Sequence, residues 1–361
     1  MKHFATCGLA AVAILLPATA AQAHENSATH PAPATSHVRP DDHAPAGVMA
    51  DHVHKAGDIM IGAIWTRERF TGANYTGTRK AADAELVAAG FTVREKAMTM
   101  DMVMGHLMWA PTDDVTLMVM PMWMRMEMDM LGIGTPDMSH GDEGGHGHHG
   151  GHGLMPGETM RHTISGMGDT KVGPLISLSR KPSLAAHAGL LLSIPTGSVS
   201  KKGHDGKFTH YGMQPGSGTW DIEPSLTVQG RNETLSWGVQ ASYLHRMEDS
   251  NKSGYRLGNV FSSTAWVAVP VAPRLSLSAR LAYRDQGAIK GHYNGAHNHS
   301  SPPDLQGNYG GQRLEAGAGA NFVIGQGLRL GAEVMVPVHQ KVNGFQLRKD
   351  YGLNLNISHA F

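Results

Sequence analysis

Long runs in which every second residue is apolar constrain the fold of this chain more than any other feature. In residues 275–283 the odd-numbered positions hold Leu, Leu, Ala, Leu and Tyr, while Ser, Ser, Arg and Ala fill the positions between them. Residues 235–243, 314–322 and 328–336 alternate in the same way. A period of two predicts β-strands with one apolar face. The runs exceed the usual globular strand of about 5–6 residues and reach the roughly 10 residues that a tilted strand needs to cross a bilayer.

The connections between these runs alternate between short and long. Twelve candidate strands lie at residues 58–66, 98–109, 115–130, 168–180, 184–194, 218–230, 235–246, 257–270, 275–286, 311–324, 328–339 and 348–361. Short connections lie at 110–114, 181–183, 231–234, 271–274 and 325–327, and longer ones at 67–97, 131–167, 195–217, 247–256, 287–310 and 340–347. Outer-membrane barrels combine an even strand number with short periplasmic turns and long external loops. We therefore predict an all-β fold, an antiparallel transmembrane β-barrel of about 12 strands in the outer membrane of a Gram-negative bacterium. A pair of soluble β-sandwiches is the alternative.

The N-terminal residues have the layout of an export signal. Lys2 precedes an almost wholly apolar stretch that ends at the triplet Ala21-Gln22-Ala23, which is typical of a cleaved signal peptide over residues 1–23. Residues 24–57 carry several prolines and histidines and show no apolar period. We predict that they form a disordered periplasmic linker. The barrel then occupies residues 58–361.

The final strand resembles the assembly signal of bacterial outer-membrane barrels. Its apolar residues fall on one face and the chain ends on an aromatic side chain; they are Tyr351, Leu353, Leu355, Ile357 and Phe361. His359 stands where such signals usually have an apolar residue. We expect this strand to contact the barrel assembly machinery.

The polar face of the strands must line the lumen if the apolar face meets lipid. The predicted lumen-facing residues are His187, Asp221, Glu223, Gln240, Arg246, Arg280, Arg284, Arg313, Glu315, Arg329 and Glu333. Because both signs of charge are present, these groups can pair across the interior. They could form a plug of salt bridges or the selectivity lining of a pore, and the sequence leaves both interpretations open.

Twelve of the 22 methionines lie on one face of a single predicted hairpin, at Met98, Met100, Met102, Met104, Met108, Met118, Met120, Met122, Met124, Met126, Met128 and Met130. A row of thioethers could form a path for Cu(I), which suits soft sulfur ligands. The opposite face carries Asp101, Arg125, Glu127 and Asp129. If these charges face the lumen, the methionines face lipid and serve as adaptable apolar residues. We therefore predict that the methionines face lipid; the alternative is that the charges lie above the membrane surface, which leaves a metal path open.

A glycine-rich stretch in a predicted external loop is dense in metal ligands, namely His140, Asp142, Glu143, His146, His148, His149 and His152. His297 and His299 lie in a later external loop, and the predicted linker contains His24, His30, His37, His43, His52 and His54. Neutral imidazole binds Cu, Zn and Ni, so we predict metal binding by the external loops and no other cofactor. The spacing fixes no coordination geometry, and a flexible polar loop without a metal is the alternative.

Four short motifs accompany the methionine-rich hairpin. They are Gly166-Met-Gly-Asp169, Leu192-Ser-Ile-Pro-Thr-Gly197, Met213-Gln-Pro-Gly-Ser-Gly-Thr-Trp-Asp221 and Tyr255-Arg-Leu-Gly-Asn259. Together they resemble the meta-pathway phenol-degradation family of transporter-like outer-membrane proteins, over residues 58–361. The resemblance implies an outer-membrane barrel and suggests that a member so rich in Met and His is associated with metals. It supplies no catalytic residue.

We therefore predict a non-enzymatic channel or transporter-like barrel that is linked to transition-metal handling, with copper as the preferred metal. The alternatives are an uptake channel for small apolar or aromatic compounds and a structural barrel without transport. Basic and acidic residues balance at 30 each, which gives no indication of nucleic-acid binding. The expected partners are membrane lipid, the assembly machinery, and metal ions or small solutes.

Overall fold

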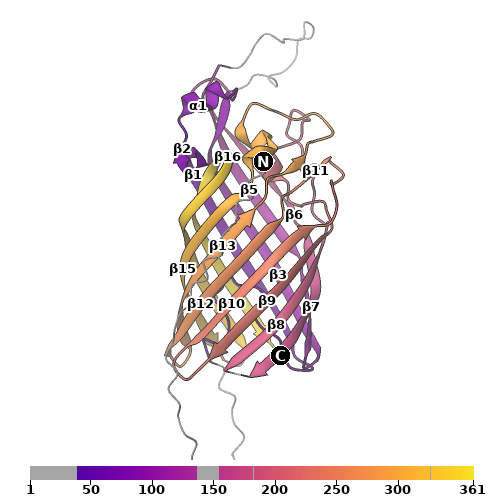
Figure 1. Ribbon diagram of the computed structural model, residues 1–361, viewed down its shortest axis with the longest axis vertical. Helices are drawn as coiled ribbons and strands as arrows, with labels where there is room; N and C mark the ends of the chain where they lie inside the picture. The colour runs from indigo at the N-terminus through magenta and orange to yellow at the C-terminus, as the bar shows by residue number, and fades with distance from the viewer. Residues whose placement is uncertain (1–38, 136–153, 182, 326) are drawn as a thin grey trace, which may run out of the picture. The chain divides into compact units, whose positions relative to one another are not determined.

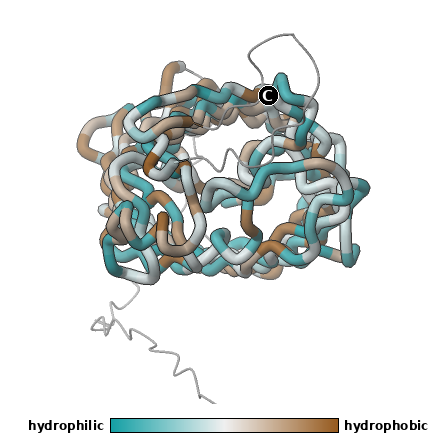
Figure 2. The backbone as a smooth tube through the Cα atoms, turned by 90° about the horizontal axis from the view of Figure 1, so that it is seen from above, coloured by the Kyte–Doolittle hydropathy of each residue, from teal (hydrophilic) through white to brown (hydrophobic). Residues whose placement is uncertain are grey.

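The computed structural model describes residues 39–135, 154–181, 183–325 and 327–361. Within them, eleven strands close into an antiparallel barrel (Figures 1 and 2). In ring order they are β1 (Ile59–Gly77), β16 (Leu328–Ala360), β15 (Gly311–Ile324), β13 (Leu275–Gln286), β12 (Val260–Ala272), β10 (Ser236–Arg246), β9 (Asp221–Arg231), β8 (Leu184–Ile194), β7 (Thr170–Lys181), β4 (Val115–Met120) and β3 (Val93–Thr112). The ring closes because β3 pairs with β1 from Ile59↔Trp109 to Thr71↔Ala97.

The long strand β16 crosses the wall twice. Its residues 328–342 pair with β15 and its residues 342–360 pair with β1. Between the two halves Gly344 has a φ of 51°, a left-handed conformation that glycine adopts without a steric penalty. Eleven strands, one of which crosses twice, give twelve crossings in the described chain. The predicted barrel of about 12 antiparallel strands is therefore confirmed.

Two strands of the ring are prolonged toward the end with the longer connections. There β5 (Met122–Gly132) follows β4 after Pro121, and β6 (Thr159–Met167) runs into β7. Smaller elements at this end are β2 (Arg79–Lys80), α1 (Asp83–Ala88), β11 (Tyr255–Arg256), β14 (Lys290–Gly291) and the 3-10 turns Tyr211–Met213, Pro302–Asp304 and Gln306–Asn308. The connections predicted at 67–97 and 131–167 were too long, because strand pairing there continues through polar residues that show no apolar period. The five predicted short turns all join paired strands.

A belt of exposed apolar side chains covers the outside of the ring. It includes Ile59, Ile61, Leu107, Trp109, Leu117, Val119, Leu190, Val239, Val267, Leu277, Leu281, Val334, Val336, Leu355 and Ile357. An outward apolar band is what a barrel presents to lipid. No helix in the described part of the chain is long and apolar enough to cross a membrane.

The C-terminal half of β16 carries its predicted apolar face outward. Tyr351, Leu355, Ile357 and Phe361 are exposed and Leu353 is half-buried, whereas the intervening Asn354 and Ser358 are buried. The strand closes the ring through its pairing with β1, and the amide of Phe361 donates to the carbonyl of Ile59. Contact with the assembly machinery stays a prediction.

Residues 39–57 form a loop inside the barrel, which we call the plug segment. Side chains from six strands hydrogen-bond to it: Ser276 of β13, Asn321 of β15, Glu333 of β16, Gln240 of β10, His187 of β8 and Thr116 of β4. Because β13 and β4 stand on opposite sides of the ring, the segment crosses the lumen. Its ends lie at the short turns, where Arg39 donates to the carbonyl of Asn232 and Gly57 donates to that of Ala110.

This placement corrects the predicted disordered linker for residues 39–57. The barrel interior supplies what the segment lacks by itself, namely partners for its backbone amides and carbonyls and an apolar surface. Ala44 and Val48, for example, are buried against Trp266. The rest of the predicted linker, residues 24–38, and the predicted signal peptide lie outside the described residues.

Candidate functional site in the barrel interior

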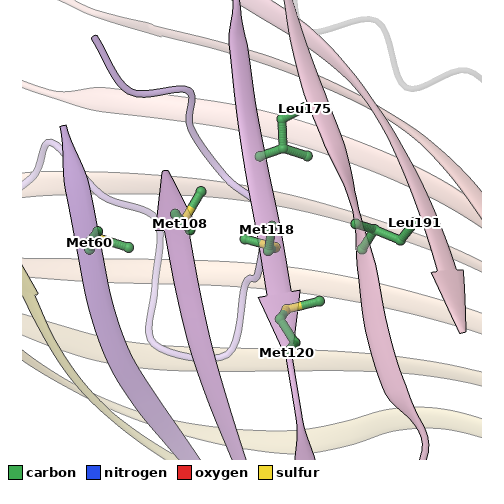
Figure 3. Packing of buried hydrophobic residues seen from close by; sticks show 6 residues of the cluster. All are labelled: Met60, Met108, Met118, Met120, Leu175 and Leu191. Atoms are coloured by element: carbon green, nitrogen blue, oxygen red, sulfur yellow. The ribbon is translucent and has the colours of Figure 1, made fainter. Parts of the chain in front are cut away.

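The twelve methionines of the hairpin, which we call the methionine track, line the interior of the barrel. Met108, Met118 and Met120 are 1–3% exposed and pack against Met49 of the plug segment. Figure 3 shows the three side chains on neighbouring strands, together with Met60, Leu175 and Leu191 of the same cluster. The residues between them, such as Leu107, Leu117 and Val119, are exposed on the outside. The prediction that the track faces lipid is therefore wrong.

The prediction failed because the charged residues on the opposite face of the hairpin lie above the apolar belt. Asp101, Arg125, Glu127 and Asp129 do lie on the outward face, but the last exposed apolar side chain of β5 below them is Trp123. Beyond it the strands rise above the apolar belt, and the charges pair along the outer wall. Arg125 contacts Glu127 at 2.5 Å, Asp129 contacts Arg161 at 2.6 Å, and Asp101 contacts Arg67 at 2.8 Å.

Strand register places the methionines directly opposite one another. The cross-strand pairs are Met98↔Met128, Met100↔Met126, Met102↔Met124, Met104↔Met122 and Met108↔Met118. At about 3.3 Å per residue and a tilt of about 40°, the ten residues from Met98 to Met108 rise about 25 Å along the barrel axis, which is close to the height of the apolar band of outer-membrane barrels. The track therefore provides a double row of thioethers of about this length, of which Met104 to Met108 lie at the height of the apolar belt and Met98 to Met102 lie above it.

A cluster of histidines meets the lower end of the track. His43, Asp51 and His52 of the plug segment have ligand atoms within 4.8 Å of one another. Nε2 of His52 lies 3.1 Å from Nε2 of His54, and the rings of His43 and His52 are 4.2 Å apart. His43, Asp51 and His52 line a small cavity of about 50 Å³, whose other walls include His106 of β3 and the track residues Met104, Met108, Met118 and Met120.

Hydrogen bonding and burial prepare these imidazoles to act as ligands. A carboxylate can only accept, so Nδ1 of His52 donates to Asp51 over 2.7 Å, which leaves Nε2 as the ring nitrogen available to an ion. Burial, reinforced by the neighbouring His52, lowers the pKa of His54 to about 3. Burial also holds the pKa of His43 well below its usual range. Neutral imidazole is the form that binds metal ions.

The predicted lumen-facing charges lie inside the ring and are extensively paired. Arg280 contacts Glu333 at 2.7 Å, Arg313 contacts Glu315 at 2.9 Å, Glu223 contacts Lys171 at 2.5 Å, and Arg329 contacts Asp42 of the plug segment at 3.9 Å. Asp221 pairs with Arg246, Arg284 donates to Gln286, Gln240 donates to the carbonyl of Met49, and His187 contacts the carbonyl of Ala50. Glu68 and Lys349, which the sequence analysis did not select, connect Arg313 and Glu315 into a four-residue network.

Loops with an aromatic core pack together at the opposite end of the barrel. Phe208 stacks on Tyr293, and Tyr293 stacks on Tyr211. Beside them His210 contacts Asp304 through a 2.7 Å hydrogen bond. Burial opposes charge on both groups, but the hydrogen bond and the opposite charges outweigh it. They raise the pKa of His210 and lower the pKa of Asp304.

The His210–Asp304 pair predicts pH-dependent docking of the loop that contains residues 301–309. The raised pKa of His210 adds stability below its ordinary value of 6.5, and this is lost as the pH rises through the raised value. The lowered pKa of Asp304 adds stability above its ordinary value of 3.8, and this is lost as the pH falls through the lowered value. Amide exchange in this loop, corrected for intrinsic rates, should be slower at about pH 5.5 than at about pH 9. Equal protection at both values, or the same difference in a His210→Asn variant, would contradict this assignment.

Of the predicted external metal ligands, the structure describes only His297 and His299. His140, Asp142, Glu143, His146, His148, His149 and His152 lie outside the described residues. His297 is half-buried and His299 is exposed, with rings 4.5 Å apart. In the sequence, His43, His52 and His54 belong to a stretch predicted as a linker, and no pattern connects them with Asp51 or His106. In the sequence these histidines stand out only by their number within a short stretch. Their role as a cluster depends on the fold, which brings this stretch to the methionine track.

Comparison with known proteins agrees with this architecture. The crystal structure of an outer-membrane channel from Pseudomonas putida F1 matches with a TM-score of 0.56 at 14% identity, covering 87% of this chain and 99% of that one. A FadL homologue from Pseudomonas aeruginosa matches with a TM-score of 0.36 at 12% identity, covering 84% and 90%. The NanC porin matches with a TM-score of 0.40 at 8% identity, covering 82% and 98%. No curated protein matches the chain.

A family assignment covers most of the barrel. Residues 121–348 match the family described as "Putative MetA-pathway of phenol degradation". The match contains the four motifs that carried the resemblance and the last five methionines of the track. The chain is an outer-membrane, channel-like β-barrel, and it belongs to this family.

Proposed function

We propose that this barrel conducts a soft transition-metal ion, copper as Cu(I), along the methionine track. The observation that carries the proposal is the register of the hairpin, which places five methionine pairs opposite one another on the inner wall. Thioethers are soft ligands that select Cu(I) over harder cations. A series of equivalent weak sites lets an ion move stepwise without being trapped at any one of them.

Packing alone does not require this composition. An apolar inner wall could use Leu, Ile or Val, whose rotamers are better defined than those of methionine. The outward apolar positions of the same strands do use Val103, Leu107, Leu117 and Val119. Methionine is thus concentrated on the inner face, where its sulfur rather than its apolar volume sets it apart.

Imidazoles lie near both ends of the track. His43, His52 and His106 line the cavity at its lower end. At the upper end His162 pairs across the strands with Met128, and its ring is 5.7 Å from that of His210. Imidazole binds copper in both common oxidation states, so these groups could receive and release the ion.

Passage of small aromatic compounds is the second candidate. It is supported by the family description and by the favourable contacts that methionine sulfur makes with aromatic rings. Leucine provides a similar apolar surface without the sulfur, so Met→Leu substitution separates the two candidates. Aromatic passage would largely survive the exchange, whereas passage of a soft cation would not.

The test measures ion flux into vesicles that contain the purified barrel, with Ag(I) as a redox-stable probe for Cu(I). Met100, Met102 and Met104 are half-buried on the inner face, and their combined replacement by Leu should lower Ag(I) flux by on the order of tenfold or more. The matched control replaces Met155, Met167 and Met247, which lie outside the track and are 46–49% exposed. K⁺ conductance should stay the same in both variants. Unchanged Ag(I) flux in the inner-face variant, or an equal loss in the control, would refute the proposal.

A further inference from the structure

We propose that the plug segment carries its own transition-metal site, built from the imidazoles of His43, His52 and His54, with Asp51 orienting His52. The site is separate from the predicted external histidine loops and stands whether or not the methionine track conducts ions. Its ligands come from one short segment that the barrel folds into a compact loop. The expected occupant is an ion that prefers imidazole, such as Zn(II) or Cu(I).

The ligand geometry fits a bound ion. With metal–nitrogen bonds of about 2.0 Å, two imidazole nitrogens in a tetrahedral site lie about 3.3 Å apart, and Nε2 of His52 lies 3.1 Å from Nε2 of His54. The ring of His43 is 4.2 Å from that of His52. Ligand atoms of His43, Asp51 and His52 also lie within 4.8 Å of one another, which places the imidazole of His43 beside the His52–His54 pair.

Asp51 would orient a metal-binding histidine without contacting the ion itself. Its Oδ1 accepts from Nδ1 of His52 at 2.7 Å, and its Oδ2 accepts from the backbone amide of Ala44 at 2.9 Å. Metal-binding histidines commonly donate their second nitrogen to a carboxylate, which fixes the tautomer and the ring orientation. The carboxylate thus joins the two arms of the plug segment and holds the Nε2 lone pair of His52 toward His54.

The surroundings of the cluster also favour a metal ion. Gly62 of β1 pairs with His106 of β3, and a Cβ at position 62 would lie 2.5 Å from Nε2 of His106. The missing side chain leaves room for that ring in the wall of the cavity. Met104, Met108 and Met118 line the same cavity, so a soft ion bound to the imidazoles would have thioethers beside it.

The experiment measures binding of Zn(II), and separately of Cu(I) under reducing conditions, to the folded full-length barrel. The background variant has Asn at His24, His30, His37, His140, His146, His148, His149, His152, His297 and His299, which removes the other histidine-rich stretches. This background should still bind one equivalent tightly. His52→Asn combined with His54→Asn should abolish binding, and Asp51→Asn should weaken it about 10–100-fold. His292→Asn, an exposed control, should change nothing.

A second measurement reports on the plug segment itself. Lys55 stands near one end of the segment, so trypsin cleavage after it reports how tightly the segment is held in the barrel; the Arg39–Pro40 bond at the other end resists trypsin because proline follows. Metal should slow this cleavage in the background chain and have no effect in the His52/His54 variant. Absence of binding by the background chain, or binding that persists in the double variant, would overturn the proposal. The Met100/Met102/Met104 variant retains this site, so failure of the site and failure of the conduction path are distinguishable.

Discussion

Replacing Gly47 with leucine is expected to raise the single-channel conductance several-fold by displacing the plug segment. Gly47 approaches the wall so closely that a Cβ would lie 2.5 Å from Nδ2 of Asn354, 2.6 Å from Oε2 of Glu333 and 2.7 Å from a terminal nitrogen of Arg280. Its amide also donates to Glu333 at 3.1 Å. A leucine side chain overlaps all three groups, and the loop is easier to move than strands held by continuous pairing.

Planar bilayer recordings of the purified protein measure this effect. The matched control is Ala56→Leu, because Ala56 lies in the same segment with its side chain exposed. Correct folding of both variants can be checked by their heat-dependent migration on a gel. A folded Gly47→Leu barrel whose conductance equals that of the wild type would show that the plug segment does not limit the pore.

The strands and turns could be predicted because they depend on local pattern. Alternation reports which side chains meet lipid, and the bilayer imposes that rule equally on every strand. The five short turns followed from the points at which alternation stops. The extra strand length above the membrane could not be predicted, since residues 67–77 and 93–97 pair through polar side chains that have water on one side.

The interior was harder to predict because it depends on contacts between distant segments. The alternation of side chains does not by itself show whether the methionine track faces lipid or the lumen, since charged residues occupy the other face of the same strands. Only their height relative to the apolar belt, beyond Trp123 on β5, shows that they lie in water. The plug segment has no periodicity, and its order comes from acceptors and donors that β4, β8, β10, β13, β15 and β16 supply. The histidines of the plug segment are therefore recognisable as a candidate site only in the folded barrel, where they lie close together.

The second large effect concerns Glu333, whose side chain is inaccessible to solvent. Its carboxylate accepts two hydrogen bonds from Arg280, one from Asn354 and one from Gly47 of the plug segment. Glu333→Ala would leave Arg280, only 10% exposed, without its partner. Removing one member of a buried pair costs about 3–5 kcal/mol, and we expect a loss of this size in the free energy of unfolding by urea in detergent micelles.

The control for this variant is Glu127→Ala, which breaks the pair with Arg125 on the outer wall. Arg125 is 51% exposed, and exposed pairs contribute at most about 1 kcal/mol. Glu333→Gln should fall between the two, because the amide oxygen still accepts from Arg280 while the charge is lost. If Glu333→Ala destabilised the barrel no more than Glu127→Ala, the buried network would be dispensable for the fold. Because Glu333 joins the wall to Gly47, the Ala variant should also raise conductance, which links the stability of the barrel to the seating of the plug segment.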